Sequence, residues 1–191
     1  MQVTRLILGS SSPRRRDLLA QIGIIPDAIV SPEIDETPLR DEAPRALAAR
    51  LARAKLAAVA HEGAFIIAAD TVLGLGSRVL PKAETEAEAR ACLTRLAGRR
   101  HKVYSAVAIR APDGRVVSRT VATVVSFARI EPAAIEDYLA SGEWQGKAGG
   151  YAIQGRAAGF VDFLSGSYSG VVGLPLHETL NLLRGLGWRA A

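Results

Sequence analysis

A continuous apolar run, AFIIAAD over residues 64–70, constrains the fold of this chain more than any other stretch. Apolar side chains that do not alternate with polar ones are typical of a strand covered on both faces, so we expect a central strand here. Asp70 is expected at the carboxyl end of that strand. A carboxylate there is costly to desolvate unless it meets a cation, hydrogen-bond donors or a metal. An aspartate that caps a turn beside Thr71 is an equally good interpretation.

Segments with helical periodicity alternate with further strand-like runs along the chain. Because no repeat or linker interrupts this pattern, we expect residues 1–191 to form a single α/β domain, with two lobes about a cleft as one option. The segment SGSYSG, residues 165–170, is expected to be a turn. The other expected strands are 5–9, 27–30, 101–111, 115–130 and 160–164, and the expected helices are 12–23, 44–61, 85–96, 132–140 and one that begins at Pro175.

Composition excludes several classes of protein. The formal net charge is +5, but basic residues are spread along the chain and aromatic residues make up only 5%, so we expect no stable nucleic-acid binding. No apolar run approaches the roughly 18–20 residues of a membrane span, and the first one is too short for a signal peptide, so we expect a cytoplasmic protein without a membrane partner. The single cysteine, Cys92, lies in a helical pattern and is expected to be buried.

Three consecutive arginines stand at the start of the first expected helix. Ser12 and Pro13 are typical of a helix start, with the serine hydroxyl capping a backbone N–H group, which places Arg14, Arg15 and Arg16 in the first turn. Cations at this end oppose the helix dipole, by roughly 0.3–1 kcal/mol each. A bound anion would resolve the conflict, because backbone N–H groups and guanidinium groups would both face it.

The remaining charged residues do not match a common catalytic motif. The sequence lacks a phosphate-binding P-loop, a dinucleotide fingerprint, metal-ligand spacing among its histidines and a serine-hydrolase elbow. An anion site together with carboxylates and lysines suits chemistry on a magnesium-bound polyphosphate. Taken singly, each of the following has a solvated surface role as its default interpretation: Glu33, Asp35, Glu36, Lys55, Lys82 and Lys147.

Read together, Arg14, Asp70 and the glycine-rich loop resemble the Maf family of nucleoside triphosphate pyrophosphatases. The resemblance implies a fold similar to the inosine-triphosphatase group, with a mixed twisted sheet, flanking helices and two lobes about a cleft. It also implies hydrolysis of a nucleoside triphosphate to the monophosphate and pyrophosphate with a divalent metal. The matching motifs, in order, are LGSSSPRRRDLL, EIDE, ARLARAKLAA, AADTVLGLGSRVLPK, HKVYSAVAI and KAGGYAIQGRAAGFVDFLSGSYSGVVGLPLHETLNLL.

The resemblance also implies roles for particular residues. Asp70 would accept the proton of the attacking water, and Arg14, Thr71 and Gln154 would set substrate choice. A divalent cation would bind at Glu36 and Asp70, with Mg²⁺ expected and Mn²⁺ or Co²⁺ as alternatives. The other polar motif positions that would line the cleft are Ser10, Arg15, Lys55 and Lys82, whereas Arg16 has no role and is expected to be solvated.

The segment GGYAIQG resembles the branch of the family that acts on dTTP and UTP, and modified pyrimidine nucleotides are further candidate substrates. A 7-methyl-GTP pyrophosphatase or an enzyme of broad specificity is the alternative. A regulator of cell division that only senses nucleotides is the non-enzymatic alternative, and a homodimer is left open. The acidic residues favour the enzyme, because a nucleic-acid binder gains nothing from carboxylates beside its arginines, whereas a metal-dependent hydrolase requires them.

Overall fold

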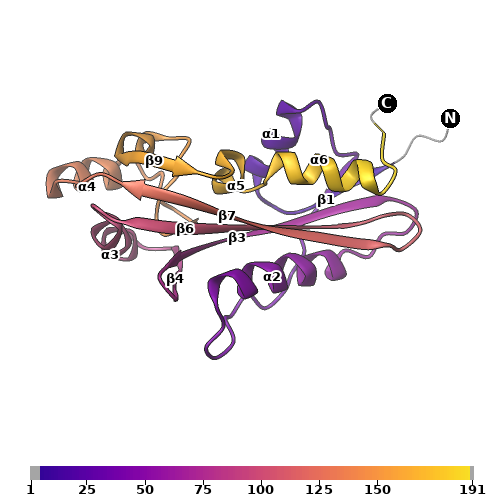
Figure 1. The fold of residues 1–191 in the computed structure, drawn as a ribbon, viewed down its shortest axis with the longest axis horizontal. Helices are drawn as coiled ribbons and strands as arrows, with labels where there is room; N and C mark the ends of the chain where they lie inside the picture. Colours follow the sequence, from indigo (N-terminus) through magenta and orange to yellow (C-terminus); the bar gives the residue numbers. More distant parts are fainter. Residues whose placement is uncertain (1–4, 190–191) are drawn as a thin grey trace.

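The computed structural model describes residues 5–189 (Figure 1). Helices cover both faces of a central seven-stranded sheet with the strand order β2-β1-β3-β6-β7-β9, and β4 extends it beside β3. The strands are β1 Leu6–Gly9, β2 Ala28–Val30, β3 Phe65–Leu75, β4 Arg78–Leu80, β5 Lys82–Ala83, β6 Arg100–Arg110, β7 Val116–Phe127, β8 Lys147–Ala148 and β9 Val161–Ser165. The helices are α1 Pro13–Gln21, α2 Pro44–Ala58, α3 Glu86–Leu96, α4 Pro132–Ala140, a 3-10 helix Arg156–Phe160, α5 Tyr168–Val172 and α6 Leu176–Gly185.

The sheet is mixed. β1 pairs in parallel with β2 and β3, and the remaining pairs are antiparallel. The pairing of β1 with β3 ends where Gly9 meets Ala68, and β4 joins the same side of β3 only from Leu73 onward. Between these two points no described strand pairs with β3 on that side. This gap lies at the carboxyl end of a parallel strand, which is where α/β sheets usually bind ligands.

Three apolar clusters divide the molecule into two lobes. In the first lobe, α1 and α6 pack on one face of the sheet and α2 packs on the opposite face (Figure 1). In the second lobe, α3 and α4 lie at the other end of the sheet, close to β9, and bury a separate cluster. The three longest strands, β3, β6 and β7, run through both lobes.

Local sequence explains most helix ends. α3 begins at a capping box in which the Thr85 hydroxyl accepts a hydrogen bond from the Glu88 backbone and the Glu88 carboxylate accepts one from the Thr85 backbone. Pro13, Pro44 and Pro132 each stand at the start of a helix, as expected. These features confirm the helices expected from 12, 44, 85 and 132.

The structure corrects four details. Asp70 lies inside β3 rather than at its end, because antiparallel pairing with β6 extends the strand to Leu75. The expected turn at 165–170 contains the start of the short helix α5, whose first N–H groups are capped by Ser167. The Ser12 hydroxyl makes no capping hydrogen bond. The Ser12 backbone carbonyl instead accepts one from the Arg15 backbone N–H. α2 ends at Ala58, before residue 61, because the chain turns to an extended conformation there.

Two other expectations concern the cysteine and membrane-spanning helices. Cys92 is buried in α3 as a free thiol, and burial raises the pKa of that thiol. None of the helices in residues 5–189 is long and apolar enough to cross a membrane.

Candidate active site

The cleft between the lobes is the place where the candidate residues meet. It has a volume of about 240 Å³ and lies beside the gap in the pairing of β3. Its lining includes every residue that the sequence analysis proposed for the site: Ser10, Arg14, Arg15, Glu36, Lys55, Asp70, Thr71, Lys82 and Gln154. These residues come from segments far apart in the chain, so the topology of the sheet brings them together.

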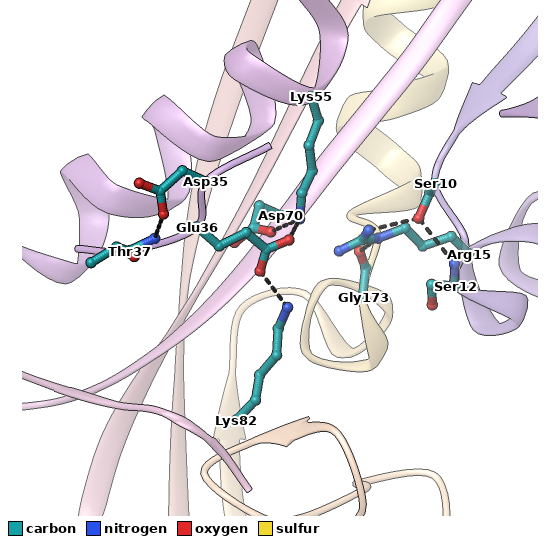
Figure 2. A network of polar contacts seen from close by, with 10 residues as sticks. All are labelled: Ser10, Ser12, Arg15, Asp35, Glu36, Thr37, Lys55, Asp70, Lys82 and Gly173. Carbon is teal, nitrogen blue, oxygen red and sulfur yellow. Dashed lines mark hydrogen bonds and ion pairs between the residues drawn. The ribbon is translucent and has the colours of Figure 1, made fainter. Parts of the chain in front are cut away.

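Ser10 and Arg15 form one side of the cleft. Ser10 directly follows β1, and its Oγ accepts hydrogen bonds from Arg15 Nη1 at 2.8 Å and from the Ser12 backbone at 3.2 Å (Figure 2). Arg15 Nε donates to the Gly173 carbonyl at 2.9 Å. Burial lowers the pKa of Arg15, and the nearby carboxylates of Asp70 and Glu36 oppose this effect. The guanidinium is therefore fixed in place with its charge beside the catalytic candidate Asp70.

A chain of alternating charges crosses the centre of the cleft. Lys55 Nζ lies 2.5 Å from Asp70 Oδ1 and 2.6 Å from Glu36 Oε1, and Lys82 Nζ lies 2.5 Å from Glu36 Oε2 (Figure 2). Lys55 and Asp70 are only 7% and 3% exposed. Burial raises the pKa of Glu36, but hydrogen bonds from the two lysines outweigh it and lower that pKa to about 2. The Glu36 carboxylate is thus held in its charged form.

The fold explains why this lysine reaches the site. Lys55 is on the face of α2 that packs against β3, whereas the preceding basic residue, Arg53, points outward to the Ser118 hydroxyl. A buried lysine must meet a counter-charge, and Asp70 on the facing strand supplies it. The solvated interpretation is therefore wrong for Lys55 and incomplete for Glu36 and Lys82, which remain partly exposed but pair with each other at the cleft. It holds for Asp35, which is exposed and accepts a hydrogen bond from the Thr37 backbone.

The residues expected to choose the substrate line the same cleft. Thr71 follows Asp70 on β3, and its hydroxyl lies 3.4 Å from the Gly173 carbonyl. Gln154 is exposed at the opposite wall. Arg14 is half-buried, and burial lowers the pKa of its guanidinium. Arg16 is exposed and pairs with Asp17, as the solvated interpretation expected.

Two lining residues were missed by sequence reasoning. Lys147 is half-buried in the cleft and not on the open surface, and Tyr151 is buried with its hydroxyl 2.8 Å from His101 Nε2. The backbone N–H of Ala152 donates to the Tyr138 hydroxyl, so two phenol groups hold the segment that leads to Gln154. The only sequence signal was the position of Lys147 and Tyr151 in the motif KAGGYAIQG.

The carboxylates of the cleft fit a divalent metal that also binds phosphate. Glu36 and Asp70 contact the same ammonium group, so their oxygens are close enough to share one cation. Within the described part of the chain, no group of three or more acidic, histidine or cysteine side chains could enclose a metal. Mg²⁺ usually binds one or two carboxylates and takes its other ligands from water and substrate phosphates. The residues present therefore suit an open metal site rather than a closed one.

The chain is similar to several known proteins. A protein named dTTP/UTP pyrophosphatase from Caulobacter vibrioides is 58% identical over 186 residues, which are 96% of both chains. Another of that name from Rhodospirillum rubrum is 57% identical and covers 96% of this chain and 89% of its own. A solved nucleoside-triphosphatase (dITP/XTP pyrophosphatase) from Mycobacterium abscessus shares 21% identity, with a TM-score of 0.40 over 66% of this chain and 74% of its own. The model of the family described as Maf-like protein matches residues 5–186, and the chain therefore belongs to the Maf family.

Proposed function

We propose that this protein hydrolyses nucleoside triphosphates, with dTTP and UTP as its preferred substrates, to the monophosphate and pyrophosphate. The observation that carries the proposal is the buried Asp70 carboxylate, which faces a cleft that also presents Arg14 and Arg15. A cleft with this combination can hold a polyanion beside a proton acceptor. The names of the two relatives with 58% and 57% identity support the choice of substrate.

Asp70 is the proton acceptor in this proposal. A water molecule attacks the α phosphorus, and its proton passes to the Asp70 carboxylate. The anhydride bond between the α and β phosphates breaks, pyrophosphate leaves, and the nucleoside monophosphate remains. The ion pair with Lys55 fixes the orientation of the Asp70 carboxylate, because Lys55 itself is held by Glu36. Lys55 is therefore a positioning residue, and Asp70 is the catalytic one.

Positive charge in the cleft stabilises the charge that develops on the phosphate oxygens. Arg15 is already oriented by Ser10 and Gly173, so it needs little reorganisation to bind a phosphate. Lys82, at the other end of the charge chain, is half-exposed and can reach a ligand while it keeps contact with Glu36. Mg²⁺ held by Glu36 and Asp70, with Mn²⁺ or Co²⁺ as alternatives, would supply further neutralisation of the phosphates.

Thr71 and Gln154 form the base-selecting part of the proposal. Both are neutral and polar, and both line the cleft outside the Lys55 charge chain. A glutamine amide presents a donor and an acceptor together, which matches the acceptor–donor–acceptor edge that uracil and thymine share. Cytosine presents a different order of groups, and purines require a larger pocket.

A panel of triphosphates tests the proposal. The purified protein is incubated with Mg²⁺ and dTTP, UTP, CTP, ATP, GTP or 7-methyl-GTP, and the monophosphate and pyrophosphate are quantified. We expect equal amounts of the two products from dTTP and UTP, and loss of the reaction when a chelator removes the metal. Release of orthophosphate in place of pyrophosphate would contradict the reaction, and preference for 7-methyl-GTP would contradict the substrate.

A further inference from the structure

The cationic side chains of the cleft differ in how their charge is balanced. Lys55 and Lys82 are neutralised by Glu36 and Asp70. By contrast, Arg14 and Lys147 form no ion pair with any carboxylate of residues 5–189. The ammonium of Lys147 donates one hydrogen bond, to the Gln145 carbonyl at 2.9 Å, and this bond leaves its charge uncompensated. Arg15, which is bound by Ser10 and the Gly173 carbonyl, likewise has no ion pair within the described residues, so the cleft contains three cations more than its own two carboxylates balance.

Arg14 and Lys147 come from opposite lobes. Arg14 is on α1, whose Leu18 and Leu19 belong to the core of the first lobe. Lys147 is on β8, and the other residue of this strand, Ala148, packs against the core of the second lobe. Both line the same cleft, so they face it from two sides.

The two charges act on each other. Burial lowers the pKa of Lys147, and the charge of Arg14 lowers it further, while the charge of Glu143 opposes both effects. Glu143 does not neutralise the ammonium, because its carboxylate accepts a hydrogen bond from the Arg156 backbone instead. Two half-buried cations that repel each other across a cleft are destabilising in the empty protein. A polyanion that contacts both would turn this repulsion into attraction.

We propose that Lys147 is a substrate-binding residue that contacts the polyphosphate from the second lobe while Arg14 contacts it from the first. This assignment rests on the proposed function, since it takes the polyphosphate to be that of a nucleoside triphosphate. A polyphosphate fits better than a single carboxylate or phosphate, because its charge extends over several groups and can meet cations on both walls. Lys147 does not select the base, because an ammonium group contacts phosphates of every nucleotide alike.

The chain offers a matched control for a test of this site. Lys102 on β6 is an exposed lysine that does not line the cleft, so Lys102→Gln removes the same charge from a different place. We compare wild type with Lys147→Gln, Lys147→Arg and Lys102→Gln. Calorimetric titration gives the Kd for inorganic tripolyphosphate, and steady-state kinetics give KM and kcat for UTP and dTTP. Thermal unfolding of each variant reports whether it folds.

A charge-assisted bond to phosphate accounts for about ten- to a hundredfold in affinity. We expect Lys147→Gln to raise the Kd for tripolyphosphate by at least about tenfold. The KM values for UTP and dTTP should rise by the same factor, so that the ratio of the KM for UTP to the KM for dTTP is unchanged. Lys147→Arg should restore most of the affinity, and Lys102→Gln should change it less than twofold. Equal effects of Lys147→Gln and Lys102→Gln would overturn the proposal and indicate a diffuse effect of net charge.

The tripolyphosphate titration separates this inference from the proposed function. If wild type hydrolyses neither UTP nor dTTP, the proposed function fails, yet the loss of tripolyphosphate affinity in Lys147→Gln still supports the binding residue. If hydrolysis is found and tripolyphosphate binds wild type and Lys147→Gln equally, the assignment of Lys147 is wrong while the proposed function stands. A shift of UTP kinetics relative to dTTP in Lys147→Gln would likewise overturn a role confined to the phosphates.

Discussion

The ammonium group of Lys55 lies 2.5 Å from the carboxylate of Asp70, and both side chains are almost completely buried. Such a pair is expensive to break, because each partner would leave a buried charge without compensation. Glu36 at 2.6 Å holds the same ammonium from the side of the cleft. The proposed proton acceptor is therefore fixed in position before any ligand arrives.

Replacement of Asp70 by Asn tests the central role in the proposed reaction. The amide cannot accept the proton of the attacking water, so we expect the rate of hydrolysis to fall by about 10²–10⁴ while triphosphate binding is largely retained. Product formation and binding of a non-hydrolysable UTP analogue are measured together. Asp113→Asn, in the exposed turn between β6 and β7, is the control and should leave both unchanged. Near-normal turnover by Asp70→Asn would show that another group accepts the proton.

The three consecutive arginines should differ in their contribution to binding. We expect Arg14→Ala and Arg15→Ala each to weaken binding of a non-hydrolysable UTP analogue by roughly one to two decades, since a charge-assisted bond contributes roughly 1.5–3 kcal/mol. Arg15→Ala should also lower the unfolding temperature, because Arg15 links Ser10 to Gly173. Arg16→Ala serves as the internal control, because Arg16 is exposed and pairs with Asp17. Equal losses in all three variants would favour a diffuse basic surface.

Gln154→Ala should reduce the preference for uracil and thymine. A site that hydrogen-bonds one base edge rejects other edges because its own polar groups are then left unpaired. Wild type should hydrolyse UTP and dTTP well ahead of CTP, ATP and GTP, and the variant should narrow this gap more than it weakens tripolyphosphate binding. The comparison uses kcat/KM for each triphosphate. An unchanged ranking of bases in the variant would remove Gln154 from the specificity site.

His101 should make the protein less stable in mild acid. Burial lowers the pKa of this imidazole to about 4, from an ordinary value of 6.5. Between these two pH values the unfolded chain binds a proton that the folded chain does not, so stability falls as the pH is lowered. The shift corresponds to about 3 kcal/mol in total at 1.36 kcal/mol per pH unit.

Chemical unfolding at pH values from 6.5 to 4.5 checks this prediction. Ordinary carboxylates, with pKa values of about 4, titrate mainly below the upper part of this window, so the slope between pH 6.5 and about 5.5 is the most specific for His101. His101→Gln should flatten the dependence on pH, although it also weakens the contact with Tyr151 and so lowers stability overall. His177→Gln, at an exposed position on α6, should keep the slope of wild type. If His101→Gln and wild type lose stability in parallel, another group takes up the proton.

Much of the architecture is predictable from local sequence. The apolar run 64–70 does lie in the centre of the sheet, and the helix starts at Pro13, Pro44 and Pro132 follow from proline geometry. The composition of the cleft was predicted through motif resemblance, because single residues such as Glu36 and Lys55 have a solvated surface role as their default. Only the ordered set of motifs distinguishes them from ordinary surface charges.

The remaining features depend on contacts between segments that are distant in the sequence. β3 continues past Asp70 because β6 pairs with it, and no local signal reveals that partner. The short helix α5 lies in a segment rich in serine and glycine, and its Gly170 carbonyl accepts a hydrogen bond from the Ser105 hydroxyl of β6 at 2.6 Å, a contact that local sequence does not reveal. Lys147 is half-buried where a surface position was expected, because its strand β8 lies beside β5 and β3, which are far away in the chain.

The continuity of β3, β6 and β7 through both lobes has a consequence for how ligands enter the cleft. Widening the cleft would bend three hydrogen-bonded strands together, so the separation of its walls is set when the chain folds. A rigid separation favours binding of ligands whose length matches it. The free energy of binding then includes no entropic cost for ordering the walls of the cleft. The sheet thus fixes the distance that a ligand must span to contact both walls of the cleft at once.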